Sequence, residues 1–390
     1  MTRRLWFIVE SGTDVRLVEG LAARWPLTVV ARRITGGREI SQPTLVAFEH
    51  RTGPGSFAAF ATWAASHLVT KRSSIGVVLV QGYGIAALAA NLAGRLARVP
   101  VVMLVCSPTE AYYRCRQRDG DRPFRPAEWI AIRVLAWLNA RVGRQYVVLS
   151  SYLASTVRGH GTPRPVAIVP VYGVDLRVFA PAFEPRAAVR RRLGLPVDPA
   201  LVFFSSRIAP EKDPDTLLAA VAALRRDGRD VRIVHRSGGH AEFCRRASEH
   251  GLLGAVIDGP ALRPGAELAA YYQASDLCVQ ASREEGLGFS PLEALACGIP
   301  VVAAAVGGLQ NTIVEGHTGW TYPPGDAQAL ARAIAHVLDD SAEARRRTDQ
   351  GRALVASEYD RDVVFGRLEA ILEPLCPPQE SGRPGLAAAL

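Results

Sequence analysis

Short apolar runs alternate with helical stretches along this chain of 390 residues. Because alternation of this kind is typical of parallel sheets covered by helices, the sequence predicts an α/β fold. A chain of this length exceeds what one hydrophobic core usually serves, so we expect two domains. The runs expected to form strands lie near Leu5, Leu27, Ile75, Val101, Tyr146 and Val166 in the first half and near Leu201, Val231, Ala255, Leu277 and Val301 in the second.

A proline-containing segment separates the two halves. Residues 180–185 read Ala-Pro-Ala-Phe-Glu-Pro, which interrupts regular structure. This break predicts domains over residues 1–180 and 181–376, with the hinge between them. Residues 377–390 contain three prolines and two glycines, and we expect this tail to be disordered.

Two carboxylates, Glu285 and Glu293, flank a glycine-containing loop that follows an apolar run. Ser290 stands where a helix N-cap belongs, proline follows it, and Glu293 comes three residues later, which is the pattern of a capping box. Gly286 and Gly288 would let an anion such as phosphate approach the free N–H groups of the helix start. The alternative, for this segment alone, is that Glu293 closes its own helix cap and Glu285 is a solvated loop acid.

A second strand, loop and helix pattern at residues 201–226 supplies two cations, Arg207 and Lys212. Only two of the 46 basic residues in the chain are lysines, so Lys212 departs from a strong preference for arginine. Because the carboxyl ends of parallel strands share one edge of a sheet, these cations and the two carboxylates are expected to converge. The alternative is a surface ion pair of Lys212 with Asp215 or Glu211.

The spacing of Arg207, Lys212 and the Glu285-x7-Glu293 pair resembles the signature of glycosyltransferase family 4, the group 1 retaining glycosyltransferases. Residues 169–175, Val-Pro-Val-Tyr-Gly-Val-Asp, are similar to the family's hinge motif. The resemblance extends over essentially the whole chain and is strongest from about residue 146 to residue 326.

The resemblance implies the GT-B fold, in which two Rossmann-like parallel-sheet domains face each other across a cleft. Residues 1–180 would bind the acceptor and residues 181–376 the nucleotide-sugar donor, with a helix at about 359–375 crossing back to the first domain. It further implies that a hexose-type sugar moves, with retention, from a nucleoside diphosphate sugar to an acceptor hydroxyl. Neither a metal ion nor another cofactor is expected.

The resemblance also assigns roles to individual residues. Arg207 and Lys212 would neutralise the diphosphate, Glu285 would hold sugar hydroxyls beside them in the catalytic centre, and Glu293 would hold the ribose. The other residues expected at the donor would contribute mainly backbone groups: Gly12, Pro260, Ala261, Gly286, Gly288, Phe289 and Ser290.

The acceptor side is marked by Cys106 and Glu110, where the chain departs from the family. Relatives commonly have histidine at the position of Cys106, and a thiol cannot replace an imidazole that donates to a sugar hydroxyl. We therefore interpret Cys106 as a small buried residue. Another departure is Tyr172, at a hinge position where the family usually has asparagine.

Two other motifs compete with this interpretation. Gly82-Tyr83-Gly84-Ile85-Ala86-Ala87 has the G-x-G-x-x-A form of a dinucleotide-binding turn, but the acid expected about 20 residues later is missing before Glu110. An NAD(P)-dependent oxidoreductase is thus a remote alternative, and we expect these glycines to form a turn that lines the cleft. The Asp-x-Asp sequences at 119–121 and 213–215 follow no apolar strand, so we interpret them as a turn and a helix cap.

Charge and cysteine usage suggest where the protein works. Residues 1–180 carry a net charge of +13 against −4 for the remainder, without the aromatic interleaving of a nucleic-acid module. This basic charge predicts a peripheral contact with an anionic membrane and an acceptor that is lipid-linked. The alternative is that the arginines are simply solvated on the surface. Six cysteines without CxxC or metal-ligand spacing suggest free thiols in the cytoplasm.

The predicted enzyme would act in cell-envelope glycan, glycolipid or secondary-metabolite biosynthesis. A different class remains open, in which the second domain binds a sugar nucleotide while the altered first domain performs no transfer and serves a partner enzyme. Cys106 is the only residue that favours this alternative.

Overall fold

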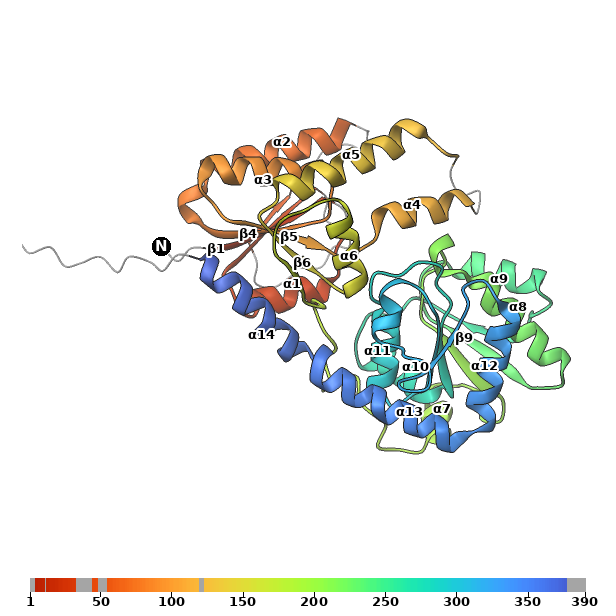
Figure 1. Cartoon of the computed structure of the whole chain (residues 1–390). Helices are drawn as coiled ribbons and strands as arrows, with labels where there is room; N and C mark the ends of the chain where they lie inside the picture. The colour runs from red at the N-terminus through yellow and green to blue at the C-terminus, as the bar shows by residue number, and fades with distance from the viewer. Residues whose placement is uncertain (1–3, 11, 33–43, 48–54, 119–122, 377–390) are drawn as a thin grey trace, which may run out of the picture.

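The computed structural model describes residues 4–10, 12–32, 44–47, 55–118 and 123–376, and its strands form two separate parallel sheets (Figure 1). All strand pairs within both sheets are parallel, and the central strands of both sheets are almost entirely buried. Near-continuous apolar runs are typical of strands covered by helices on both faces. The predicted α/β architecture is confirmed. The tail and the 119–121 motif lie outside the described residues.

The first sheet has seven strands in the order β3-β2-β1-β4-β5-β6-β7. In Figure 1, α2, α3 and α5 lie together over one face, while α1 and α14 lie on the other. The strands are β1 (Arg4–Val9), β2 (Leu27–Ala31), β3 (Thr44–Ala47), β4 (Ile75–Gln81), β5 (Val101–Val105), β6 (Gln145–Val148) and β7 (Val166–Ile168), and the helices are α1 (Val15–Ala22), α2 (Gly55–Thr70), α3 (Ile85–Ala97), α4 (Thr109–Arg118), α5 (Pro126–Val142) and α6 (Ser151–Gly159).

The second sheet has six strands in the order β10-β9-β8-β11-β12-β13. Its strands are β8 (Ala200–Phe204), β9 (Val231–His235), β10 (Val256–Asp258), β11 (Leu277–Gln280), β12 (Val301–Ala304) and β13 (Trp320–Tyr322). The helices after β7 are α7 (Arg186–Arg192), α8 (Pro214–Arg226), α9 (His240–Glu249), α10 (Ala266–Ala274), α11 (Phe289–Ala296), α12 (Ala327–Asp339), α13 (Ser341–Leu354) and α14 (Arg361–Leu372).

Two edge strands, β3 and β13, were not expected from the sequence. Each is short, at four and three residues, and each pairs with only one neighbour. The other eleven strands lie where the apolar runs predicted them. An edge strand needs less buried apolar surface than a central one, so its sequence signal is weaker.

The strand order reverses once in each sheet, between β1 and β4 in the first and between β8 and β11 in the second. In open parallel sheets, ligands bind at such switch points, outside the carboxyl ends of the strands. The loops after these four strands are therefore the places where functional side chains are expected.

The chain passes between the domains twice, and the two passages are hydrogen-bonded to each other. The Val174 N–H donates to the Tyr359 carbonyl at 2.7 Å, and the Arg361 N–H donates to the Val174 carbonyl at 3.0 Å. Gly173, with φ of 54°, lies so close that an added Cβ would be 2.7 Å from the Arg361 Cα. Tyr172 also has a positive φ, of 64°, a conformation that asparagine adopts more easily than tyrosine.

Helix α14 lies against α1 of the first domain. Phe365 is fully buried, and an added Cβ on Gly20 would lie 1.9 Å from its ring. The Arg24 guanidinium lies over the same ring at 4.6 Å and pairs with Asp362 at 2.8 Å. The last helix is thus part of the first domain's packing.

Within the described residues, no helix is long and apolar enough to cross a membrane. The longest uncharged stretch, from Ser73 to Gly94, ends a short 3₁₀ helix and then forms β4, a turn and part of α3.

We expect Phe365→Ala to lower the free energy of unfolding by about 3–5 kcal/mol, because it removes a buried ring between α14 and α1. Chemical denaturation of the full chain measures this loss. The matched control is Phe183→Ala, whose ring is exposed and whose loss should change stability by less than about 0.5 kcal/mol. Equal stability of the two variants would show that α14 does not dock on α1.

Candidate functional site

Lys212 and Glu285 meet at the switch point of the second sheet. Lys212 follows β8, Glu285 follows β11, and the lysine Nζ donates to the Glu285 Oε2. The same oxygen accepts from the Ser282 Oγ at 3.2 Å and the Gln280 Nε2 at 3.3 Å. Both charged side chains are largely buried, at 15% and 9% exposed. The predicted convergence of these two residues is therefore found in the structure.

The alternative surface pairs of Lys212 are not found. Asp215 instead pairs with Arg246 at 2.6 Å, and Glu211 pairs with Arg207. Lys212 is the last residue of a short 3₁₀ turn, and its side chain extends toward the first domain. It therefore pairs with Glu285 and with neither of these two acids.

Arg207 lies at the mouth of this site and is half-exposed, at 52%. Its partner Glu211 is fully buried and also lies 3.5 Å from Arg116 of α4, in the first domain. Burial raises the pKa of Glu211, but its own backbone N–H and the two guanidinium groups outweigh burial and hold the pKa below its usual value. Arg207 is thus accessible to a ligand while keeping a fixed carboxylate partner.

The predicted capping box at Ser290 is wrong. Helix α11 begins at Phe289, with Gly288 as its N-cap, and no side chain caps it. Gly288 has φ of 88°, which glycine adopts without strain, so the helix starts earlier than the serine-proline signal indicated. Its free N–H groups are those of the first turn, which includes Phe289 and Ser290.

Glu293 instead turns toward the first domain. Its Oε1 accepts from the Arg16 Nη1 at 2.5 Å, and its Oε2 accepts from the Tyr272 Oη at 2.9 Å. Burial raises the pKa of Glu293, while Arg16 and the tyrosine hydroxyl oppose that rise. The carboxylate predicted for the ribose is therefore engaged across the cleft in this structure.

Arg16 is a site residue that the sequence analysis missed. It is held by Asp14, the N-cap of α1, through bonds of 2.9 and 2.7 Å, and its guanidinium lies 5.0 Å from the Tyr172 ring. Phe289 stacks beside that ring, with centroids 4.1 Å apart. The sequence signal that could have identified Arg16 was its position, since it is a cation just after the first strand and at the start of a helix.

The loop that carries Gly286 is held from both sides. The Ser150 Oγ of the first domain donates to the Gly286 carbonyl at 2.6 Å, and an added Cβ on Gly286 would lie 2.7 Å from the Cys106 carbonyl oxygen. From the second domain, the Gly308 N–H donates to the Glu285 carbonyl at 2.9 Å. Gly286 is required here because any side chain would push the domains apart.

The first-domain residues predicted for the site lie at different depths. Gly12 is exposed after β1, and its carbonyl accepts from the Gln81 Nε2 at 3.4 Å. Cys106 ends β5, and burial raises the pKa of its thiol to about 12, which keeps it neutral. Glu110, in the first turn of α4, lines a cavity with Cys106. Tyr112 of the same helix donates to the Glu285 Oε1 at 3.4 Å.

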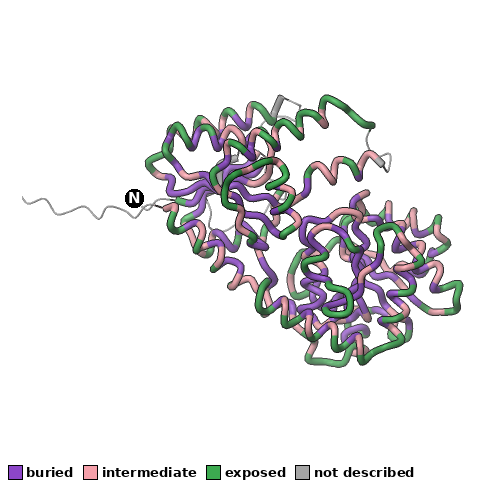
Figure 2. The backbone as a smooth tube through the Cα atoms, in the orientation of Figure 1, coloured by how far each residue is buried: buried purple, intermediate pink, exposed green. Residues whose placement is uncertain are grey.

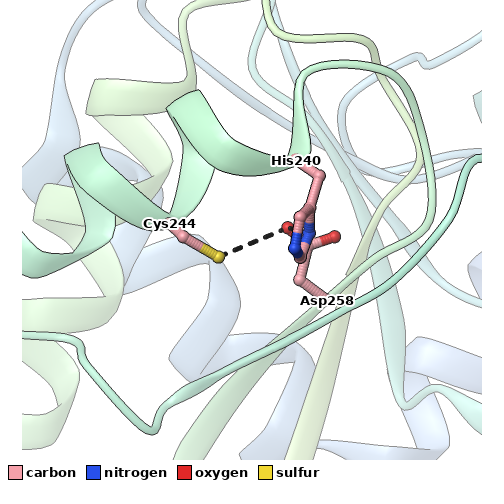
Figure 3. Close-up of side chains that lie close together, drawn as sticks. All are labelled: His240, Cys244 and Asp258. Carbon is pink, nitrogen blue, oxygen red and sulfur yellow. Dashed lines mark hydrogen bonds and ion pairs between the residues drawn. The ribbon is translucent and has the colours of Figure 1, made fainter.

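The predicted loop at Pro260 and Ala261 follows β10, where the structure brings together His240, Cys244 and Asp258 (Figure 3). Among the described residues, these three form the one group that offers three metal-ligand atoms within 4.8 Å of one another. The histidine and cysteine stand four residues apart on α9, a spacing that the analysis of the cysteines overlooked.

Asp258 is already well satisfied without an ion. Its Oδ2 lies 2.5 Å from the His240 Nδ1 and accepts from the Cys244 Sγ at 3.6 Å. Its Oδ1 lies 3.0 Å from the His235 Nδ1 and accepts from the Gly259 N–H at 2.7 Å. This hydrogen-bonded cluster fixes the start of the loop that carries Pro260 and Ala261.

The competing motifs have structural roles in the parts that the structure describes. Gly84 caps α3, and an added Cβ there would lie 1.7 Å from the Glu10 Oε2, so a carboxylate occupies the place of a dinucleotide phosphate. The expected turn at these glycines is found, and it lines a cavity. Asp213 caps α8 and pairs with Arg283 at 2.9 Å, which agrees with the helix-cap interpretation.

The second domain matches the model of a known family, "Glycosyl transferases group 1", over residues 185–354. The D-inositol 3-phosphate glycosyltransferase of Thermobispora bispora is 39% identical over 247 residues, which cover 58% of this chain and 54% of that protein. The protein of the same name from a Nocardioides species is 40% identical over 186 residues, covering 44% of this chain and 40% of the relative. The chain thus spans about half the length of the curated relatives it matches.

Solved structures show the same two-domain arrangement over nearly the whole chain. Sucrose-phosphate synthase from Thermosynechococcus elongatus superposes with a TM-score of 0.76 at 22% identity, covering 95% of this chain and 99% of that one. The structure of Anabaena HepE in complex with UDP-glucose superposes with a TM-score of 0.76 at 17% identity, covering 95% of this chain and 100% of that one. The predicted GT-B fold and the resemblance to group 1 glycosyltransferases are confirmed. Residues 185–354 therefore match the glycosyl transferases group 1 family, and the chain as a whole has the two-domain GT-B fold.

Proposed function

We propose that this protein is a retaining glycosyltransferase that moves a hexose-type sugar from a nucleoside diphosphate sugar to an acceptor hydroxyl. The observation that carries the proposal is the buried Lys212–Glu285 pair at the switch point of a group 1 domain. This pair places a cation for phosphate and a carboxylate for sugar hydroxyls side by side, facing the first domain.

Each predicted residue has a part in this proposal. Lys212 and Arg207 neutralise the diphosphate, aided by the free N–H groups at the start of α11. Glu285 accepts hydrogen bonds from sugar hydroxyls, and Glu293 accepts them from the ribose. The acceptor oxygen forms its bond to the sugar C1 as the bond from C1 to the diphosphate breaks, and the departing phosphate takes the acceptor proton.

The Arg16–Glu293 pair makes donor binding depend on an exchange of partners. Because Arg16 occupies one Glu293 oxygen, the ribose binds only when the guanidinium moves away. The diphosphate offers the displaced cation a new anionic partner on the same side of the cleft. Donor binding would thus give Arg16 a new anionic partner, while the ribose hydroxyls would replace the guanidinium as hydrogen-bond donors to Glu293.

We also propose that no metal ion or other cofactor takes part. Negative charge that develops on the leaving diphosphate is met by Arg207, Lys212 and the dipole of α11. In the described part of the chain, neither Asp213 nor Asp215 is available as a metal diad, because each pairs with an arginine.

Donor binding predicts a thermal shift. A nucleoside diphosphate at about 100 times its dissociation constant should add roughly 2.7 kcal/mol of stability. We expect one of UDP, GDP, ADP or TDP, with excess EDTA, to raise the melting temperature of the wild type. Lys212→Ala should abolish that rise because the diphosphate loses its buried cation.

The matched control is Lys71→Ala, which removes the other lysine of the chain from an exposed position in the first domain. This variant should keep the full nucleotide response. A nucleotide response that survives in Lys212→Ala would contradict the assigned site.

Retention and metal independence have their own test. The product should carry the anomeric configuration of the donor sugar, read by NMR coupling constants, and the transfer rate should be unchanged by excess EDTA. An inverted product would refute the retaining mechanism, and an EDTA-sensitive rate restored by magnesium would refute metal independence. Slow donor hydrolysis without acceptor would exclude the noncatalytic partner subunit.

We infer, in addition, that the first domain docks on an anionic membrane at the cytoplasmic face, where a lipid-linked acceptor would lie. Helix α5 is exposed along much of its length (Figure 2). Its exposed residues include Ile130, Val134 and Trp137, together with Arg133 and Arg141. The neighbouring helix α3 exposes two leucines and two arginines: Leu92, Leu96, Arg95 and Arg98. Apolar side chains flanked by arginines are typical of helices that lie in a membrane interface.

We expect the wild type to bind vesicles of phosphatidylglycerol and phosphatidylcholine, with affinity falling as salt rises. Ile130→Glu should weaken binding roughly tenfold, because it adds a negative charge and removes an apolar contact. Vesicle co-sedimentation measures the effect. Leu253→Glu, at an exposed leucine of the second domain, is the control and should bind like the wild type. Absence of binding at low salt would refute the docking surface.

A further inference from the structure

We propose that the acceptor is an unphosphorylated, hydroxyl-rich ring, and that an amino group on the ring strengthens its binding. The inference rests on the proposed transferase function and names the class of its second substrate. It comes from a cavity in the first domain whose described lining contains two carboxylates and neither lysine nor arginine.

The cavity lies at the switch point of the first sheet, opposite the donor loops. Its walls come from the ends of β1, β4 and β5 and from helices α4, α5 and α6. Its volume is about 230 Å³, below the roughly 300–1,000 Å³ of pockets for drug-sized ligands. The space therefore suits one ring rather than a long chain of sugars.

The cavity adjoins the place where transfer would occur. Cys106 lines it, and the Cys106 carbonyl lies against Gly286 of the donor loop. Helix α4, which contributes Glu110 to the cavity, also contributes Tyr112 to the Glu285 carboxylate. A ring in the cavity is thus next to the residues proposed to hold the donor sugar.

The charges in the cavity disfavour an acceptor phosphate. Glu10 and Glu110 are both part of its wall, and His160 is the one described lining residue able to carry a positive charge. His160 lies 3.6 Å from Glu110, so even when protonated it offsets only that carboxylate. A phosphate group would face like charge in a partly buried site, whereas an ammonium group would face opposite charge.

Two buried polar atoms of the residues that line the cavity have no hydrogen-bond partner among the described residues. They are the Tyr83 hydroxyl and the Gln81 Oε1, whereas the Glu110 Oε1 faces the His160 Nε2 at 3.6 Å. Buried polar atoms are almost always paired in native proteins, so these two favour a polar ligand. Ring hydroxyls both donate and accept, and they would supply partners for both.

The rest of the wall suits the carbon face of such a ring. Val105, Ile132, Leu135 and Ala136 supply an apolar side opposite the polar atoms. A site with few directed polar groups on an otherwise apolar wall is typical of small-molecule recognition.

Arg116 is a described arginine close to this cavity. It lines a neighbouring cavity of about 310 Å³ with Tyr112 and Tyr113, and it lies 3.5 Å from the buried Glu211. Because Arg116 already faces that carboxylate, a phosphate there would compete with an existing pair.

Two matched pairs of probes test the acceptor class: myo-inositol against D-inositol 3-phosphate, and glucosamine against glucosamine 6-phosphate. Isothermal titration is done on the full chain saturated with its nucleoside diphosphate. In each pair we expect the unphosphorylated probe to bind at least tenfold more tightly, and glucosamine to bind more tightly than myo-inositol.

The variant Glu110→Gln should remove most of the preference for glucosamine over myo-inositol, because it replaces the carboxylate that faces the ammonium group. Glu19→Gln, at an exposed acid of the same domain, is the control and should keep the wild-type preference.

The proposal is overturned if a phosphorylated probe binds as tightly as its unphosphorylated partner, or if neither unphosphorylated probe binds up to its solubility limit. Failure of the proposed transferase function is separate, since it would appear as loss of the nucleotide thermal shift, which does not involve the cavity.

Discussion

The structure depends on one constraint, that two parallel sheets present their carboxyl edges to the same cleft. At the edge of the second sheet, Lys212 and Glu285 form a buried ion pair, and at the edge of the first sheet Glu10 and Glu110 line a cavity. Each set lies at a point where strand order reverses, because the loops diverge there and leave room for a ligand. In the proposed function, anion recognition and ring recognition would lie on different domains, and the contact between the domains would bring them together.

That contact includes several specific interactions. Arg16 reaches Glu293, Tyr112 reaches Glu285, and Ser150 holds the Gly286 carbonyl. Each joins a residue of the first domain to a loop or helix of the second. Removing one partner of a buried charge pair is far more costly than losing an exposed one, so the Arg16–Glu293 pair stabilises this arrangement more than an exposed pair would.

Much of this was predictable from the sequence, for physical reasons. Buried parallel strands are continuous apolar runs, so eleven of the thirteen strands were predicted. The convergence of Lys212 with Glu285 was predicted because the carboxyl ends of parallel strands share one edge of the sheet. The helix start at Gly288 was not predicted. A glycine that adopts a positive φ and a serine followed by proline can both mark a helix start, and a single sequence does not show which of the two is used. Contacts between domains, such as Arg16 with Glu293, have no local pattern at all, since they join positions 277 residues apart.

The two chain passages between the domains determine how the cleft moves. Because Val174 is hydrogen-bonded to both Tyr359 and Arg361, the passages behave as one double-stranded pivot. A pivot of this kind resists sliding and permits rotation about a single axis. Substrate entry and product exit would then be one swinging motion, and stiffening the pivot at Gly173 would slow both by the same factor.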